Sequence, residues 1–287
     1  MKSLPKRNFS TKDCIALITG ATAGLGAEFA RQLAPAASRL ILVGRREERL
    51  SALVESLRQQ NPSLKIDAFK ADLSMASERE RLTTWIVREE IPLNLLINNA
   101  GLGDLGPFDN AVWERLSPML EVNITALTHL THLLLPMLRA QAEISSAAIL
   151  NVSSVAGFFP IPEMAVYAAT KAYVTSFSEA LRMELAPSGI SVTALCPGPV
   201  PTEFFEVASR AGEKIRAMDR SHPALATSPE RVVRAALKGL ERDKPGVIPN
   251  RLLALLVRGV RLLPFPVIRT AIRLGAGPSK PVKNGVE

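Results

Sequence analysis

IALITGATAGLGAEFARQL, residues 15–33, is a short apolar run, a glycine-rich turn and an amphipathic segment in direct succession. Glycine allows the tight turn, and the first backbone amides of a following helix can bind a pyrophosphate. A glycine-rich turn alone is weak evidence, because any tight turn favours glycine. Its place between a predicted strand and a predicted helix makes a dinucleotide site the better interpretation. The cofactor contacts expected here are Gly20, Thr22, Ala23, Gly24, Leu25 and Gly26.

Short β-rich apolar runs alternate with longer amphipathic stretches, which predicts a parallel sheet with helices on both faces. Strands are expected at residues 15–19, 40–43, 64–69, 93–97, 147–152, 191–195 and 246–248. Helices are expected at residues 25–33, 47–60, 76–90, 110–139, 162–185 and 229–241. We therefore predict one doubly wound (Rossmann) α/β/α domain over residues 1–249, with a mostly parallel seven-stranded sheet. Residues 250–287 are expected to form a helical extension rather than an independent domain.

Composition excludes several classes of protein. A chain of 287 residues that is 47% hydrophobic can bury a substantial core, so it is not a disordered protein. The apolar run at residues 15–18 is too short for the core of a signal peptide. No uninterrupted apolar stretch reaches the roughly 18 residues that a spanning helix needs. The expected location is therefore the cytoplasm, where Cys14 and Cys196 would be buried thiols.

The net charge of +8 raises the question of a nucleic-acid partner. Residues 250–287 hold seven Lys/Arg against one acid, a net +6, which leaves +2 for the other 249 residues. The basic character thus belongs to the extension. No basic stripe with interleaved aromatic residues runs through the main body, so we expect no nucleic-acid partner. No Cys, His and acid spacing suits a metal either, and we expect no metal site.

The second predicted strand ends at Gly44-Arg45-Arg46, where an acidic residue would bind both ribose hydroxyls of NAD. An acid is missing, and the guanidinium groups of Arg45 and Arg46 suit a 2′-phosphate. The sequence therefore favours NADP(H) over NAD(H). The alternative is a solvated charge at a helix start, with Glu47 and Glu48 as partners.

Tyr167 and Lys171 are four residues apart in a predicted helix, so they project from one face. A nearby ammonium favours the phenolate, which would make the tyrosine an acid/base near neutral pH. Ser154 follows the predicted strand at 147–152 and could hold a reacting oxygen. Each residue also has a simpler interpretation, as a half-exposed helix surface or a local turn cap.

Taken together, these residues resemble the classical short-chain dehydrogenases/reductases over residues 13–249. Thr19 to Gly26 resembles the family's T-G-x-x-x-G-x-G turn, Asn98-Asn99-Ala100-Gly101 its N-N-A-G, and Tyr167 to Lys171 its Y-x-x-x-K. Asp72-Leu73 resembles the adenine-contacting pair, Asn123 the catalytic asparagine, and Pro197-Gly198-Pro199-Val200-Pro201-Thr202 the nicotinamide-proximal loop. Six ordered matches give a strong combined signal.

The resemblance implies a role for each residue. Tyr167 would be the acid/base, Lys171 would lower its pKa and bind the nicotinamide ribose, and Ser154 would orient the substrate oxygen. Asn123 would hold a water that returns a proton to the tyrosine. Further cofactor contacts would be Asp72, Leu73, Asn99, Ala100, Gly101, Pro197, Gly198, Val200 and Thr202. The family also implies a homodimer or homotetramer formed through the helices at 110–139 and 162–185.

The predicted reaction is hydride transfer between NADP(H) and a ketone, aldehyde or alcohol. Apolar residues dominate the loops expected around the nicotinamide, which favours a hydrophobic substrate. These residues are Leu102, Leu105, Phe108, Phe158, Phe159, Ile161, Met164, Phe204 and Phe205. The alternative is a sensor or scaffold protein that binds NADP(H) without catalysis, because a fold alone does not establish activity.

Arg251, Arg258 and Arg261 fall close to one face of a predicted helix in the extension, and leucines make up most of the remainder. Such a segment can pack its leucines on the body or on a partner subunit. It can also lie in an anionic membrane interface, so residues 250–274 are a candidate for peripheral membrane contact. Both interpretations stay open on sequence alone.

Overall fold

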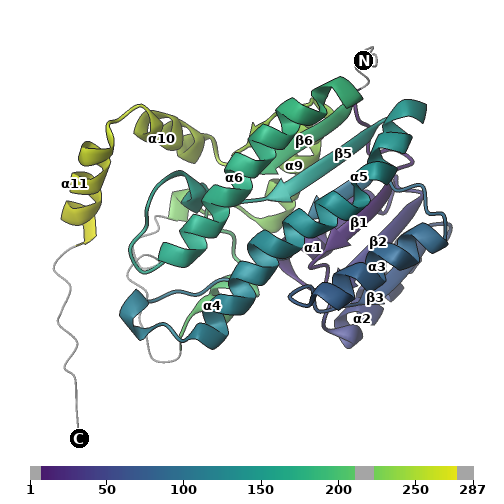
Figure 1. Cartoon of the computed structure of the whole chain (residues 1–287), viewed down its shortest axis with the longest axis horizontal. Helices are drawn as coiled ribbons and strands as arrows, with labels where there is room; N and C mark the ends of the chain where they lie inside the picture. Colours follow the sequence, from purple (N-terminus) through teal and green to yellow (C-terminus); the bar gives the residue numbers. More distant parts are fainter. Residues whose placement is uncertain (1–7, 211–222, 277–287) are drawn as a thin grey trace, which may run out of the picture.

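The computed structural model describes residues 8–210 and 223–276, and within them one parallel sheet has the strand order β3-β2-β1-β4-β5-β6-β7. The strands are β1 (Ile15–Thr19), β2 (Arg39–Gly44), β3 (Lys65–Lys70), β4 (Leu95–Asn98), β5 (Ala147–Val152), β6 (Ile190–Leu195) and β7 (Gly246–Val247). The chain starts at β1 in the middle, builds outward to β3, and then returns to place β4 on the other side of β1 (Figure 1). This reversal between β1 and β4 is the point where open α/β sheets bind ligands. The predicted doubly wound sheet is confirmed.

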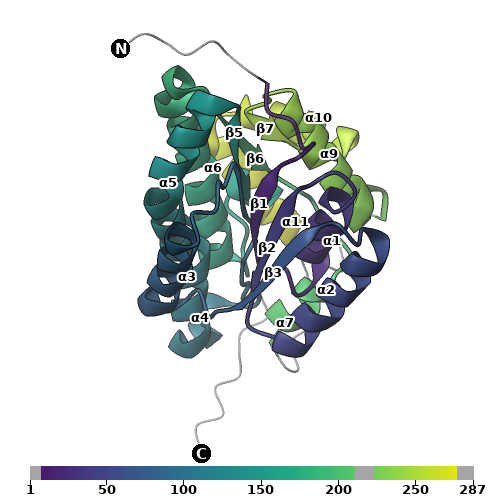
Figure 2. The same ribbon diagram turned by 90° about the vertical axis from the view of Figure 1, so that its right-hand side faces the viewer.

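Helices cover both faces of the sheet, as Figure 2 shows when the sheet is seen nearly on edge. One layer holds α1 (Gly24–Leu33), α2 (Glu47–Gln60) and α9 (Pro229–Glu241). The other holds α3 (Ala76–Arg88), α5 (Leu127–Ile144) and α6 (Ala165–Leu185). Alternate residues of one strand face opposite layers: Ile18 packs in the first and Leu17 in the second. The central strands are therefore apolar on both faces, as a covered parallel sheet requires.

The long helix predicted at 110–139 has different limits and an interruption. Phe108–Asn110 forms a 3₁₀ turn and Ala111 and Val112 are extended, so α4 begins only at Trp113 and runs to Leu120. A π-helical segment, Glu121–Ala126, then leads into α5, which ends at Ile144. Similarly, α6 begins at Ala165 rather than residue 162, because Glu163 has a left-handed φ of 66°. Apolar periodicity located these helices but not their ends.

Two helices, α10 (Arg251–Arg261) and α11 (Phe265–Ala276), extend from the body at the left of Figure 1. The Asn250 side chain caps α10 by accepting a hydrogen bond from the Leu253 amide at 3.1 Å. Leu253 and Val257, one turn apart, are buried against the body. The helical extension expected after residue 249 is thus present through residue 276. Residues 277–287 of that prediction lie outside the described residues. Within the described part of the chain, no helix is long and apolar enough to cross a membrane.

A buried chain of polar side chains ties the two strands beside the switch point to the helices above them. Asn98 of β4 donates to Asn151 of β5 at 2.9 Å and to Thr131 of α5 at 3.0 Å. Asn151 in turn donates to Ser178 of α6 at 2.9 Å. All four side chains are buried. A buried polar group without a partner is costly, so these hydrogen bonds favour the arrangement in which β4, β5, α5 and α6 meet; Asn98 Oδ1 is the buried atom that has no partner among the described residues.

We predict that Asn151→Ala destabilises the protein by about 2–4 kcal/mol, because it leaves buried polar groups of both neighbours short of a partner. Ser178→Ala is the matched control. It removes only the end of the chain, so we expect a loss of about 1 kcal/mol. Guanidinium chloride unfolding of the two variants and the parent measures both values. Equal losses in the two variants would mean that Asn151 does not act as the central link.

Candidate functional site

A cavity of about 530 Å³ opens at the carboxyl edge of the sheet, above the switch point. The β1–α1 turn, the ends of β2 and β3 and the loops after β4, β5 and β6 all contribute to its lining. Of the sequence-predicted cofactor and catalytic residues, all line this cavity except Gly26 and Asn123. The structure therefore brings together residues that are up to 182 positions apart in the chain.

The glycine turn is held by close backbone contacts. Gly20 and Gly24 have left-handed φ values of 68° and 53°. A Cβ on Gly20 would lie 2.8 Å from the Ala100 Cα, and one on Gly26 would lie 2.2 Å from the Gly20 carbonyl oxygen. Gly26 therefore acts away from the cavity, by letting α1 begin directly beneath the turn.

The start of α1 fits the pyrophosphate of a dinucleotide. The N-cap residue, Ala23, makes no side-chain hydrogen bond, and the first turn of α1 contains no acidic residue. The first amides and the positive end of the helix dipole are thus available to an anion at the cavity wall. Next to them, the Asn99 and Ala100 amides both donate to Thr19 Oγ1 at 2.9 Å, which joins the β4 loop to the turn.

The two arginines after β2 have different partners. Arg45 Nη1 lies 3.8 Å from Asp72 Oδ2, and its side chain is 59% exposed. Arg46 binds Thr22 Oγ1 and the Glu203 carboxylate, which Arg49 Nη1 also binds at 2.6 Å. These two arginines lower the pKa of Glu203 to about 2.

The pairing of Glu203 with the two arginines was not predicted from the sequence, because 157 positions separate Glu203 from Arg46 and no local pattern connects them. In the alternative considered from the sequence, Glu47 or Glu48 would pair with these arginines. Glu47 instead binds Lys70 at 2.9 Å. The charges at the start of α2 are therefore engaged across the cavity mouth and not only along their own helix.

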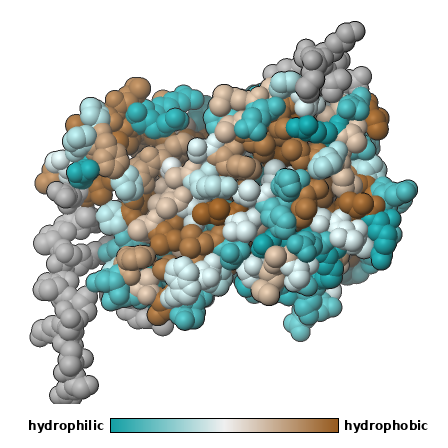
Figure 3. Space-filling model, viewed as in Figure 1, coloured by the Kyte–Doolittle hydropathy of each residue, from teal (hydrophilic) through white to brown (hydrophobic). Residues whose placement is uncertain are grey.

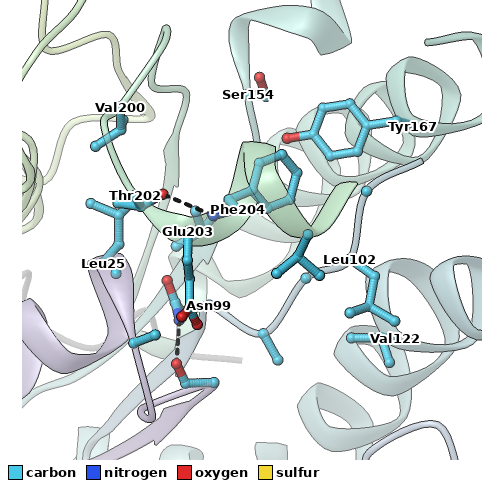
Figure 4. Close-up of a pocket in the computed structure, with 18 of the residues that line it drawn as sticks. Leu25, Asn99, Leu102, Val122, Ser154, Tyr167, Val200, Thr202, Glu203 and Phe204 are labelled. Atoms are coloured by element: carbon cyan, nitrogen blue, oxygen red, sulfur yellow. Dashed lines mark hydrogen bonds between the residues drawn. The ribbon is translucent and has the colours of Figure 1, made fainter. Parts of the chain in front are cut away.

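Tyr167, Ser154 and Lys171 lie together at the other end of the cavity. In Figure 4 the Tyr167 hydroxyl points to the side where Ser154 lies. Burial raises the pKa of Tyr167 to about 12, and the hydrogen bond with Ser154 opposes this rise. Burial also lowers the pKa of Lys171 to about 8.

The expected lowering of the phenol pKa by Lys171 does not outweigh the effect of burial. The Lys171 Nζ donates to the Val152 carbonyl at 2.9 Å and lies 5.7 Å from the centroid of the Tyr167 ring. Burial thus has the larger effect on the phenol in this structure. At neutral pH Tyr167 carries its proton and Lys171 carries its charge.

Asn123 lies in the π-helical segment and is buried. Its Oδ1 accepts from the Leu102 amide at 2.8 Å, and its Nδ2 donates to the Leu102 carbonyl at 2.9 Å and to Thr170 Oγ1 at 3.0 Å. The side chain thereby fixes the loop after β4 against α6. Both of its amide hydrogens are used in this contact, so the side chain cannot also donate to a water.

The wall around Tyr167 is apolar. The Phe204 ring lies 5.4 Å from the Tyr167 ring, centroid to centroid, and the two are side by side in Figure 4. Six of the apolar residues expected here line the cavity: Leu102, Leu105, Ile161, Met164, Phe204 and Phe205. Val122 and Val207 also line it and were not foreseen.

Three of the expected wall residues are not part of the cavity. Phe108, Phe158 and Phe159 do not line it, and Phe108 is 65% exposed. Asp104, which lies in the same loop as Leu102, is buried and binds Arg115 at 2.7 Å and Arg210. Its charge is therefore neutralised behind the wall rather than presented to a ligand.

Comparison with known proteins agrees with this geometry. Residues 14–212 match the family model for short chain dehydrogenases. A sulfoacetaldehyde reductase of Chromohalobacter salexigens is 40% identical over 202 residues, which cover 67% of this chain and 74% of that protein.

Two solved structures extend the likeness over nearly the whole chain. A short-chain dehydrogenase from Sphingobium yanoikuyae in complex with NADPH has a TM-score of 0.75 at 31% identity, covering 93% of this chain and 96% of its own. A bulky-bulky ketone specific alcohol dehydrogenase from Comamonas testosteroni has a TM-score of 0.70 at 29% identity, covering 96% of both chains. By its family match, its sheet order and its nucleotide-type cavity, this chain belongs to the short-chain dehydrogenase/reductase family of oxidoreductases.

Proposed function

We propose that the protein transfers a hydride between NADP(H) and the carbonyl or alcohol carbon of a hydrophobic substrate. One observation carries the proposal: a single cavity has the glycine turn and Arg45 at one end, and the Ser154–Tyr167 pair in an apolar wall at the other. The relatives support it, since one neighbour is in complex with NADPH and another is specific for bulky ketones.

Tyr167 is the proposed acid/base. Its pKa of about 12 keeps the phenol protonated, so it can donate its proton to the oxygen of a ketone or aldehyde as that carbon is reduced. Ser154 orients that oxygen by a hydrogen bond. The Lys171 ammonium, 5.7 Å from the ring centroid, stabilises the tyrosinate that proton transfer leaves. A bound nicotinamide would supply or accept the hydride.

Asn123 and Lys171 have further proposed roles. Lys171 binds the nicotinamide ribose as well as acting on Tyr167. Asn123 belongs to a relay in which a water returns a proton to the tyrosine. Because the side-chain amide hydrogens of Asn123 are used by Leu102 and Thr170, it would reach that water through its remaining acceptor capacity or its backbone.

The proposed cofactor contacts follow the cavity from the adenine end to the nicotinamide end. The glycine turn and the start of α1 bind the pyrophosphate, Asp72 and Leu73 contact the adenine, and the loops after β4 and β6 border the nicotinamide. Arg45 is the better candidate for the 2′-phosphate, because its contact with Asp72 is loose while Arg46 is held by Glu203. NADP(H) is therefore preferred to NAD(H) in this proposal.

The apolar wall supports a hydrophobic substrate rather than a small anionic one. The Chromohalobacter relative is named for sulfoacetaldehyde, which carries a sulfonate group. Binding of a sulfonate is favoured by a cation near the reacting carbonyl. Among the described residues, the cations that line the cavity are Arg45, Arg46 and Lys171, and both arginines are at the cofactor end. The described lining therefore favours an apolar carbonyl substrate over a sulfonate.

Assembly and location complete the proposal. Helix α6 exposes the small residues Ala169, Ala172 and Ser176 beside the stacked rings of Tyr173 and Phe177. Such a surface lets a second helix approach closely, which supports a homodimer or homotetramer. A cytoplasmic location stays a prediction from the sequence.

Tyr167→Phe should keep NADPH binding and lose about 10²–10⁴-fold in kcat, because the packed ring stays and only the proton donor is removed. The measurement is NADPH oxidation with a panel of hydrophobic ketones and aldehydes, beside a binding assay for NADPH. Tyr173→Phe is the matched control, since that exposed hydroxyl bonds Thr128 on the surface and should leave the rate unchanged. A parent protein that binds NADPH and reduces nothing on a broad panel would favour the non-catalytic sensor.

Arg45→Asp should weaken NADPH binding by about one to two decades, because a charge-assisted contact to the 2′-phosphate is lost. NADH binding should be retained or improved, so the preference inverts. Arg58→Asp, at the far exposed end of α2, makes the same charge change as a control and should leave the preference intact. Equal NADPH and NADH affinities in the parent protein would contradict the assignment of Arg45.

Light scattering at micromolar concentration should give the mass of two or four chains. Ser176→Arg, which places a long charge on the exposed face of α6, should lower that mass toward one chain, because a buried unpaired charge disrupts an interface. Ser51→Arg on the exposed side of α2 should not. A monomeric parent, or an unchanged mass in the Ser176→Arg variant, would argue against assembly through α6.

A further inference from the structure

Helix α10 has two different apolar faces. Leu253 and Val257 are buried against the body, but Leu252, Leu255 and Leu256 point away from it and are exposed. The three exposed leucines are spaced i, i+3, i+4, so they form one stripe on the helix surface. One face is thus used for packing, and a second has no partner in the described chain.

The exposed apolar surface continues past the end of α10. Leu262 is 85% exposed in the connection, and Phe265, Val267 and Leu274 of α11 are exposed as well. Val267 and Leu274 are seven residues apart and share one face of that helix. In Figure 3, brown apolar side chains gather over α10 and α11 in the upper left part of the molecule. Apolar patches of this kind on a monomer are typical of interaction sites.

Arginines border this surface, and residues 250–276 contain no acidic residue. Arg251, Arg258 and Arg269 are all exposed. Arg251 and Arg258 are seven residues apart, on a face of α10 next to the leucine stripe. We call residues 250–276 the basic arm. Its exposed surface combines aliphatic side chains with positive charge.

We propose that the basic arm binds the surface of an anionic lipid bilayer, with its exposed leucines among the acyl chains near the headgroups and its arginines on the lipid phosphates. Such an interface offers acyl chains to the leucines and phosphate groups to the arginines. The helices have 11 and 12 residues, well short of the roughly 20 needed to span, so the contact is peripheral.

A second copy of the chain fits the same surface less well. In a two-fold dimer the same patch meets itself, so the arms would bring their arginines together with no carboxylate between them. The Leu253 face of α10 is already buried against the body. Anionic lipid is the occupant that complements the charge and covers the leucines.

The arm also lies next to the catalytic cavity. A Cβ on Gly198, in the loop after β6, would lie 2.4 Å from Leu253 Cδ2, so α10 packs directly on a loop that lines the cavity. Arg261 lies over the Phe158 ring at 5.4 Å, beside the turn that follows Ser154. If the proposed function holds, the bilayer contact places the apolar cavity near the phase in which apolar substrates dissolve.

Co-sedimentation of the full-length protein with vesicles tests the proposal. We expect binding to vesicles of phosphatidylcholine with phosphatidylglycerol, weak binding to phosphatidylcholine alone, and release in high salt. The variant Arg251→Gln/Arg258→Gln/Arg269→Gln should bind the anionic vesicles on the order of 100-fold more weakly, since each basic residue near the surface contributes to binding. The variant Leu252→Gln/Leu255→Gln/Leu256→Gln should also bind weakly, and raised lipid charge should not restore it.

The matched control is Arg58→Gln/Arg88→Gln/Arg139→Gln, which removes three exposed arginines from the body and leaves the arm intact. It should bind vesicles like the parent. NADPH binding and the mass from light scattering are measured for every variant, so that misfolding is seen directly. The proposal fails if the parent does not bind anionic vesicles, or if the control loses as much binding as the arm variant. It also fails if the parent does not bind vesicles and the leucine variant lowers the mass of the assembly, because the arm would then be an interface between copies of the chain. None of these readouts depends on turnover.

Discussion

The contact between Gly26 and the Gly20 carbonyl is the constraint on which the site depends. No side chain fits there, since a Cβ on Gly26 would lie 2.2 Å from that oxygen. Because α1 starts directly beneath the turn, its first amides face the cavity rather than a capping side chain. Asn99 and Ala100 then hold the β4 loop to Thr19, which places the two sides of the switch point together. The strand order explains where the cavity is, and this contact explains why it suits a dinucleotide.

The sequence predicts those parts of the molecule that depend on local pattern or on glycine. The sheet follows from short apolar runs that must be covered on both faces, and the turn follows from three glycines between a strand and a helix. Contacts between distant segments are not available from such patterns. The Glu203 ion pairs and the bond of Asn123 to Leu102 arise only when loops meet at the edge of the sheet. The start of α6 was predicted at residue 162 rather than at Ala165, because a left-handed residue such as Glu163 does not alter the spacing of the apolar residues.

Burial decides the electrostatics of the Tyr167 end of the cavity. A pair of tyrosine and lysine on one helix face suggests a lowered phenol pKa when only the two charges are considered. The structure encloses both groups, and desolvation disfavours the charged form of each, which raises the pKa of the phenol and lowers that of the ammonium. The Ser154 hydrogen bond is the contact that acts against this on the phenol. At neutral pH the Tyr167 phenol therefore keeps its proton and can donate it. A tyrosinate at this position would be stabilised by the Lys171 charge and by a hydrogen-bond donor.

Helix α7 (Glu203–Ala208) carries residues that contact both ends of the cavity. Its first residue, Glu203, is held by Arg46 and Arg49 beside the predicted phosphate position, and its second, Phe204, packs on the ring of Tyr167. Thr202 caps the helix by accepting a hydrogen bond from the Phe204 amide (Figure 4), and Glu203 and Phe204 are consecutive residues of this short helix. The ion pairs of Glu203 therefore help to fix the helix that carries Phe204 against Tyr167. Exposed ion pairs contribute little to stability, so the value of this contact lies in where it places Phe204 rather than in the energy it adds.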